Sequence, residues 1–401
     1  MTFSKRTNWN TEENELARKL RERQASGLPI FDLTASNPTR CGFTYPADLL
    51  QPLSNPAALD YDPNPKGSHR AREAVSRYYA SHSTTVNPDQ IILTTSTSEA
   101  YSYIFKLLCN PGDTILVPQP CYPLFDFLVE AEVVNLSYAT FVYDHGWQLD
   151  LESLRRQITP TTRAIVLVHP NNPTGHFTRP EEAAELATLC REHNLALIID
   201  EVFLDYAIAP SPGQESFAAR NLDILIFIVS GISKIAALPQ MKAAWLLALG
   251  PGSEAALARL EVLADTYLSM NAPIQSALPT WLYQRSHLQS QIHTRLQTNL
   301  AQLDRSLAAQ LAQQQWVSRL QIEGGWYAVL RIPATQSDEH TARGLLDLGV
   351  LIHPGHFFGF PPSGWLVISL LTIPAQFSAG VEHLLGYIKR NQESNGEPLS
   401  P

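Results

Sequence analysis

Three reactive side chains each stand just after an apolar, strand-like run of the sequence. They are the amide of Asn172, the carboxylate of Asp200 and the amine of Lys234, and the runs before them span 164–168, 195–199 and 224–229. An amide donates to a ligand oxygen, a carboxylate pairs with a cationic ring nitrogen, and a desolvated lysine attacks a carbonyl carbon to form a Schiff base. Because ligand groups gather at the carboxyl ends of parallel strands, we expect the three side chains to share one site.

Each of these residues also has a simpler interpretation. Asn172 lies in a turn-rich string at 169–175, Asp200 could cap a following helix, and Lys234 could extend from a surface loop into water. Each segment in isolation leaves both interpretations open.

A fourth feature is a hydroxyl-rich turn at 94–100, ahead of a helix that we expect to run to about Cys109. Free N–H groups and the helix dipole make such a turn an anion cradle, although the same residues could simply cap the helix. Tyr122, between Pro120 and Pro123, places an aromatic ring near the same sheet edge or packs in the core.

The elements that must position these residues alternate between β-rich runs and helical segments. The runs lie at 91–95, 114–118, 164–169, 195–200, 224–229 and 243–249. This alternation predicts an α/β fold with a mostly parallel sheet whose strands are buried on both faces by helices.

The flanking segments indicate further elements. We expect an amphipathic helix from Asn10, as N-cap, to Gly27, and a proline-punctuated loop over 31–61 that lines a site. After Gly250 the pattern is helical through Gln315. Strand-like pieces at 326–332 and 365–371 then indicate a smaller α+β lobe.

The composition excludes several classes of protein. Of the 401 residues, 44% are hydrophobic, and 29 basic against 38 acidic side chains give a formal net charge of −9. Such a chain folds around a core and has no global positive field for nucleic acid or anionic lipid. The N-terminus lacks an apolar signal segment, and the four cysteines lack metal-ligand spacing. We therefore expect a cytoplasmic protein with reduced thiols and no metal, nucleic-acid or membrane partner.

Taken in order, these segments resemble the fold-type I pyridoxal-phosphate (PLP) enzymes, and most closely the class I/II aminotransferases. The resemblance runs from Tyr61-Asp62-Pro63-Asn64-Pro65-Lys66-Gly67 through the four features above to Glu323-Gly324-Gly325-Trp326 and His353-Pro354-Gly355. It implies a mostly parallel seven-stranded sheet covered by helices, plus a smaller α+β domain. The implied division is an N-terminal arm with part of the small domain at 1–45, a large PLP-binding domain at 46–283 and the small domain at 284–401.

The resemblance also assigns a role to each matching residue. It makes Lys234 the Schiff-base lysine and general acid/base, and Asp200 the partner of the pyridinium nitrogen. Asn172 would bond the phenolic oxygen of the cofactor, and Tyr122 would stack on its ring. The phosphate would be held by Thr97, Ser98, Ser233, Lys242 and, from the other subunit of a homodimer with composite sites, Tyr61.

Three positions depart from the family pattern. Phe203 stands where a tyrosine usually joins Asn172 at the ring oxygen, and Lys242 replaces the usual phosphate-binding arginine. Val367 stands where an arginine clamps the substrate carboxylate through two hydrogen bonds. The candidates to replace that arginine are Arg40, His353 and His356.

The resemblance therefore implies an aminotransferase that moves an amino group between an L-amino acid and a 2-oxo acid by a ping-pong mechanism. A PLP-dependent lyase, decarboxylase or racemase is the alternative, because the missing arginine removes the feature most typical of amino-acid transaminases. A third interpretation is a non-catalytic PLP-binding sensor that has kept the fold. The retention of Lys234, Asp200 and Asn172 counts against it.

Overall fold

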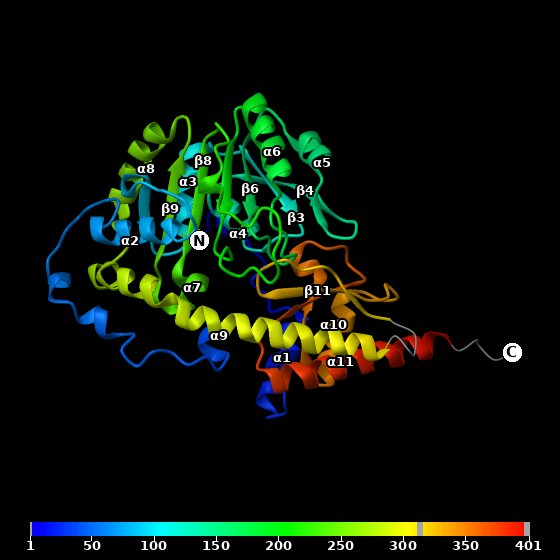
Figure 1. Ribbon diagram of the computed structural model, residues 1–401. Coiled ribbons are helices and arrows are strands. Elements are labelled where there is room, and N and C mark those ends of the chain that lie inside the picture. The colour runs from blue at the N-terminus through cyan, green and yellow to red at the C-terminus, as the bar shows by residue number, and fades with distance from the viewer. Residues whose placement is uncertain (1, 311–315, 397–401) are drawn as a thin grey trace.

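The centre of the protein is an eight-stranded, mostly parallel sheet. The computed structural model describes residues 2–310 and 316–396, and its larger part holds this sheet (Figure 1). The strands lie side by side in the order β2 (Ile91–Thr94), β9 (Ala244–Leu249), β8 (Ile226–Gly231), β7 (Ala196–Asp200), β6 (Thr162–Val168), β3 (Thr114–Gln119), β4 (Asn135–Tyr143) and β5 (Trp147–Leu149). The strands from β8 to β4 are parallel, whereas β9 is antiparallel to its two neighbours and β5 to β4.

The predicted fold class is confirmed, with one strand more than the seven expected. Two strands lie outside the predicted runs: β4, and β5, which is three residues long and lies at the sheet edge beside β4. All six predicted runs form strands, with ends that differ by two residues at most.

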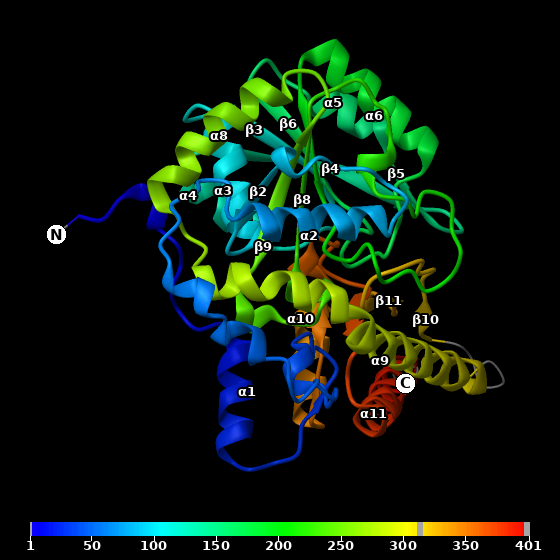
Figure 2. The same ribbon diagram turned by 60° about the vertical axis from the view of Figure 1, so that its left-hand side comes forward.

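Helices cover both faces of this sheet because its strands are apolar on successive residues. In β8, Ile226 and Ile228 belong to the core on one face, and Phe227 and Val229 to the core on the other. The first core also takes side chains from α2 (His69–Ala80), α5 (Leu151–Gln157) and α6 (Pro180–His193), and the second from α3 (Thr97–Leu108), α4 (Phe125–Ala131) and α8 (Ser253–Tyr267). Figure 2 shows α5 and α6 side by side at one end of the sheet.

The smaller part of the molecule is built on a four-stranded antiparallel sheet. Its strands follow the order β10 (Ser318–Arg319), β11 (Tyr327–Arg331), β14 (Trp365–Ser369) and β13 (His353–Pro354). The N-terminal segment joins this part, because β1 (Phe31–Asp32) pairs in parallel with β12 (Val350–Leu351). Its helices are α1 (Glu15–Ala25), α10 (Asp338–Asp347) and α11 (Pro374–Gly396).

One long helix connects the two parts. α9 (Ala272–Gln310) runs along their boundary and contacts α2 of the larger part and α11 of the smaller part (Figure 1). The division predicted between residues 283 and 284 falls inside this helix, which continues across it. The last part of the predicted helical region, 311–315, lies outside the described residues.

The N-terminal helix begins four residues later than its sequence pattern suggests. Asn14, not Asn10, is its N-cap, because the Asn14 side chain accepts a hydrogen bond from the N–H of Ala17. The side chain of Asn10 instead accepts from the N–H of Glu12 in a local turn. The N-cap assignment to Asn10 was therefore wrong, since two asparagines compete for the same role.

The described residues contain no helix long and apolar enough to cross a membrane. The same residues contain no group of three or more His, Cys, Asp or Glu side chains placed to hold a metal ion.

Candidate active site

The three reactive side chains line one cavity at the carboxyl edge of the large sheet. This cavity measures about 310 Å³ and lies between the ends of β6, β7 and β8 and the small part. Eight residues predicted for the site border it: Thr97, Ser98, Tyr122, Asn172, Asp200, Ser233, Lys234 and Lys242. The fold thus brings together segments that are up to 145 residues apart, counted from Thr97 to Lys242.

Lys234 reaches the cavity because β8 ends in a tight strand-to-helix junction. A Cβ atom at Gly231 would lie 2.8 Å from the Cβ of Ala244, so the junction needs glycine. The hydroxyl of Tyr206 then donates to the carbonyl oxygen of Lys234 at 2.6 Å. Burial lowers the pKa of Lys234 to about 8, and the nearby carboxylate of Asp200 opposes that shift. A buried amine that loses its proton near neutral pH is a competent nucleophile.

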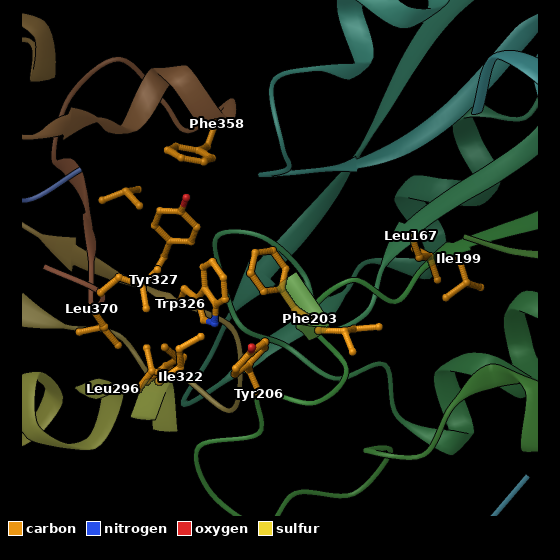
Figure 3. Close-up of a cluster of buried hydrophobic side chains, with 14 of the residues drawn as sticks. Leu167, Ile199, Phe203, Tyr206, Leu296, Ile322, Trp326, Tyr327, Phe358 and Leu370 are labelled. Atoms are coloured by element: carbon orange, nitrogen blue, oxygen red, sulfur yellow. The ribbon is translucent and has the colours of Figure 1, made fainter. Parts of the chain in front are cut away.

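Two aromatic rings border the amine of Lys234. Its Nζ lies 5.0 Å from the ring centroid of Trp326 and 5.7 Å from that of Phe203. Figure 3 shows that Trp326 lies beside Phe203 and Tyr206, with Tyr327 next to it in the chain facing Phe358. Trp326 and Phe203 meet edge to face at 5.3 Å between centroids, so they form a dry wall beside the lysine.

Asp200 is the last residue of β7 and is buried. One carboxylate oxygen accepts from the N–H of Val202 at 3.0 Å, and the other accepts from the hydroxyl of Tyr101 at 3.1 Å. Burial raises the pKa of Asp200 to about 6, although both hydrogen bonds and Lys234 oppose the rise. A carboxylate held in this way gains free energy from a cationic ligand in the cavity.

Asn172 is held in a rigid loop after β6. The loop is fixed because the N–H of His169 donates to the carbonyl oxygen of Asp200 at 2.7 Å and Asn171 donates to that of Pro120 at 3.1 Å. The Oδ1 atom of Asn172 is buried and has no hydrogen-bond partner among the described residues. A buried amide oxygen that lacks a hydrogen-bond partner at a cavity wall can accept a hydrogen bond from a polar ligand.

The hydroxyl-rich turn forms the start of α3 as predicted. The Ser96 side chain caps the helix by accepting from the N–H of Glu99 at 3.2 Å. The N–H groups of Thr97 and Ser98 lie in the first helical turn, where no intrahelical acceptor exists. Together with Ser233 and Lys242, they form a site of the kind that binds phosphate.

A seam of polar contacts fixes the small part against the Asn172 loop. The buried carboxylate of Glu323 accepts from the N–H of Phe177 at 3.1 Å and pairs with Arg179. The backbone of Gly324 approaches the loop so closely that a Cβ atom at Gly175 would lie 2.5 Å from its carbonyl oxygen. Because Tyr327 follows Gly324 by three residues, these contacts help to position one side chain that borders the cavity.

Three predicted site residues lie elsewhere in the single chain. Tyr61 is 81% exposed and lines a separate cavity of about 290 Å³. Arg40 is exposed on the surface, and His356 lies 4.0 Å from Glu339. None of the three borders the cavity around Lys234.

Tyr101 and Ser36 are among the cavity residues that were missing from the prediction. Tyr101 holds Asp200, and its position four residues after Thr97 on α3 was the available signal, because that spacing repeats one helical face. Ser36 also borders the cavity, and only its place in the proline-punctuated loop pointed to it.

Comparison with known proteins places this arrangement in a family. The family model for aminotransferase class I and II matches residues 55–384. Glutamate-pyruvate aminotransferase AlaA of Escherichia coli (strain K12) is 31% identical over 271 residues, which cover 66% of each chain and thus just under two thirds of AlaA. Alanine aminotransferase of Mycobacterium tuberculosis (strain ATCC 25618 / H37Rv) is 27% identical over 91% of this chain and 87% of its own.

Solved structures show the same fold. The alanine aminotransferase from Pyrococcus furiosus superposes with a TM-score of 0.85 at 22% identity, covering 97% of this chain and all of that one (100%). An aminotransferase from Escherichia coli gives a TM-score of 0.84 at 24% identity over 97% and 98% of the two chains. From the family match over most of its length, this chain belongs to the class I and II aminotransferases, which use pyridoxal phosphate.

Proposed function

We propose that the protein is an aminotransferase that moves an amino group between an L-amino acid and a 2-oxo acid by a ping-pong mechanism. One observation carries this proposal: the buried, readily deprotonated Lys234 shares a cavity with the buried Asp200, whose carboxylate lacks a full counter-charge. The names of the relatives, glutamate-pyruvate and alanine aminotransferase, support the substrate class.

The cavity residues fit pyridoxal phosphate group by group. Asp200 would supply the anion that keeps the pyridine nitrogen protonated, and the amide Nδ2 of Asn172 would donate to the phenolic oxygen. Tyr122 offers a ring face, while Thr97, Ser98, Ser233 and Lys242 hold the phosphate. When bound there, the cofactor supplies an aldehyde carbon and a ring that accepts electrons.

Lys234 is the group that we assign to proton transfer. As a free amine it takes the proton from the donor carbon that bears the amino group, and it delivers a proton to the former aldehyde carbon. With the cofactor bound, the donor amino acid would leave as a 2-oxo acid, and its amino group would stay in the site for the acceptor. The dry wall of Trp326 and Phe203 keeps bulk water away from this amine.

We also propose that the active form is a homodimer in the cytoplasm. Tyr61 is exposed in the single chain, which suits a residue that reaches the phosphate in the other subunit. The four cysteines are unpaired, as a reducing compartment requires. Arg40 and His356 remain proposed substrate contacts that would have to move toward the cavity.

The test is covalent trapping followed by a half-reaction. Borohydride reduction of the protein with pyridoxal phosphate should attach the cofactor to the peptide that contains Lys234, as seen by mass spectrometry. L-Glutamate or L-alanine should then convert the unreduced enzyme to its pyridoxamine form, which 2-oxo acids reverse. Trapping on another lysine would contradict the assignment of Lys234.

A second candidate is a PLP-dependent lyase, decarboxylase or racemase, which the valine at position 367 favours. Val367 is fully buried on β14 and brings no charge to the substrate side of the cavity. The same half-reaction decides between the two candidates. A cofactor that returns to its aldehyde form after each turnover, with no pyridoxamine accumulating, would identify the second.

A further inference from the structure

The cavity has no cation left for a substrate carboxylate once the cofactor is in place. Among the described residues, its charged lining consists of Asp200, Lys234 and Lys242. The proposed function assigns all three to the cofactor. The rest of its lining is therefore neutral, because Arg40 and His356 lie outside it.

The small part of the molecule contributes Tyr327 and Ser36 to the cavity, and we assign this side to the substrate. Burial raises the pKa of the Tyr327 phenol to about 12, against the effect of its hydrogen bond with Ser36, so the phenol is neutral at physiological pH. Tyr327 and Val329 are two residues apart on β11, so they share one face of the small sheet. That face of the sheet supplies the Tyr327 hydroxyl to the cavity, and the loop that contains Ser36 supplies a second hydroxyl.

The residues behind this wall add no charge. Val367 is the register partner of both Val329 and His353, so all three lie on the face that carries Tyr327. Val367 is fully buried and does not border the cavity. Burial lowers the pKa of His353 to about 4, although Asp32 opposes the shift, so this imidazole is neutral as well.

The segment around Tyr61, which we assign to the site of a second subunit, has no basic residue between Arg40 and Lys66. Residues 41–65 contain no Lys, Arg or His. They contribute Asp60 and Asp62 beside Tyr61 at the separate cavity of about 290 Å³. This segment therefore adds acidic rather than basic side chains near Tyr61.

From these observations we propose that the preferred amino donor is an amino alcohol or amino amide, with an uncharged polar group where an amino acid has its α-carboxylate. A carboxylate loses its hydration in this pocket without gaining a cation, whereas a neutral hydroxyl or amide needs only the hydrogen bonds that Tyr327 and Ser36 offer. This inference rests on the proposed function. Amino acids still react, as the poorer donors.

The half-reaction keeps the balance of an ordinary transamination. The donor carbon loses its proton to Lys234 and two electrons to the aldehyde carbon, its C–N bond breaks, and water supplies the oxygen of the new carbonyl. An amino alcohol thus yields a hydroxyketone, and the aldehyde oxygen leaves as water. No other oxidant is needed.

The experiment compares L-alanine, L-alaninol and L-alaninamide on the holoenzyme. The three share the methyl side chain and the amino carbon, and alanine and alaninol have amino groups of similar basicity. Conversion of the cofactor to its pyridoxamine form, followed by absorbance, should give alaninol a kcat/KM at least about tenfold above that of alanine. 2-Methylalanine and its amide lack the transferable hydrogen, so the absorbance shift reports their binding alone. The amide should bind more tightly than 2-methylalanine.

The variant Tyr327→Phe tests which group recognises the donor. Its loss of one hydroxyl should lower kcat/KM for alaninol about fivefold to tenfold and leave 2-aminobutane, which has no polar group there, nearly unchanged. An equal loss for both donors would show that Tyr327 only shapes the pocket and would contradict its role in recognition.

The outcomes separate this inference from the proposed function. Alanine reacting tenfold faster than alaninol would overturn the inference and leave transamination intact. If Arg40→Gln then removed that advantage, the carboxylate clamp would be Arg40. Absence of pyridoxamine formation with all donors, including L-glutamate, would instead overturn the proposed function, and the inference with it.

Discussion

The two walls of the cavity differ in charge. The wall on the side of the large sheet carries Asp200, Lys234 and Lys242, whereas the small part contributes Tyr327 from β11 and Ser36 from a loop. Asp200 ends a buried strand and Lys234 lies in the short helix that follows another, while Lys242 is exposed. The difference supports our proposals that the charged wall holds the cofactor and that neutral groups recognise the substrate.

The largest effect on the charged wall is expected from removing the amine of Lys234. Lys234→Ala should lower the rate of pyridoxamine formation by about a thousandfold, because both the covalent link and the proton carrier are lost. Stopped-flow absorbance measures the rate. The exposed Lys5 is a matched control, and Lys5→Ala should react like the wild type. A rate for Lys234→Ala within tenfold of wild type would remove the lysine from the chemistry.

Asp200→Asn should lower the half-reaction rate by about a hundredfold, because the ring nitrogen loses its counter-charge. The same change should stabilise the cofactor-free protein. In the folded state the carboxyl keeps its proton up to a pKa of about 6, so wild-type stability falls as pH rises from about 4 to 6. Above pH 6 the variant should gain up to about 3 kcal/mol in the free energy of unfolding.

Urea unfolding at pH 4 and pH 8 measures this second effect. The difference between variant and wild type should be small at pH 4, where both carry a neutral group, and favour the variant at pH 8. If the variant instead loses stability relative to wild type between pH 4 and pH 8, burial of the Asp200 carboxylate does not destabilise the folded protein.

The seam between the walls is tested by Gly175→Ala. Gly175 has φ +75°, and its new Cβ would lie 2.5 Å from the carbonyl oxygen of Gly324, so the small part must shift. We expect a loss of about 2–4 kcal/mol in stability. Gly27→Ala is the matched control, with φ +66° and nothing within 4 Å, and should cost about 1 kcal/mol. Equal losses for both would mean that the seam tolerates displacement.

The smallest effect concerns the side of the site that we assign to the second subunit. Tyr61→Phe should weaken pyridoxal phosphate binding by about tenfold or less, the value of one lost hydrogen bond. Cofactor release followed by fluorescence measures it. Tyr283, which is 85% exposed, provides the control Tyr283→Phe. If the two variants bind the cofactor equally well, Tyr61 does not reach the phosphate.

Much of the site could be predicted because its residues follow apolar strands. The runs before Asn172, Asp200 and Lys234 are buried on both faces, which only a helix-covered parallel sheet satisfies, and parallel strands deliver their ends to one edge. Tyr101 and Ser36 escaped because their own segments predict a core helix and a loop. Neither segment contains a local pattern that indicates a contact with a strand from a distant part of the chain.

The sequence by itself determined the fold class, the order of the strands along the chain and the identity of the reactive side chains. These follow from local patterns, namely apolar runs, caps and turns. The tertiary structure alone decided which residues border the cavity. The pairing of β11 with β14 buried Val367 behind Tyr327, and the seam at Glu323 fixed that wall against the large sheet. Contacts between distant segments set burial, and burial sets the charge of Lys234, Asp200 and His353.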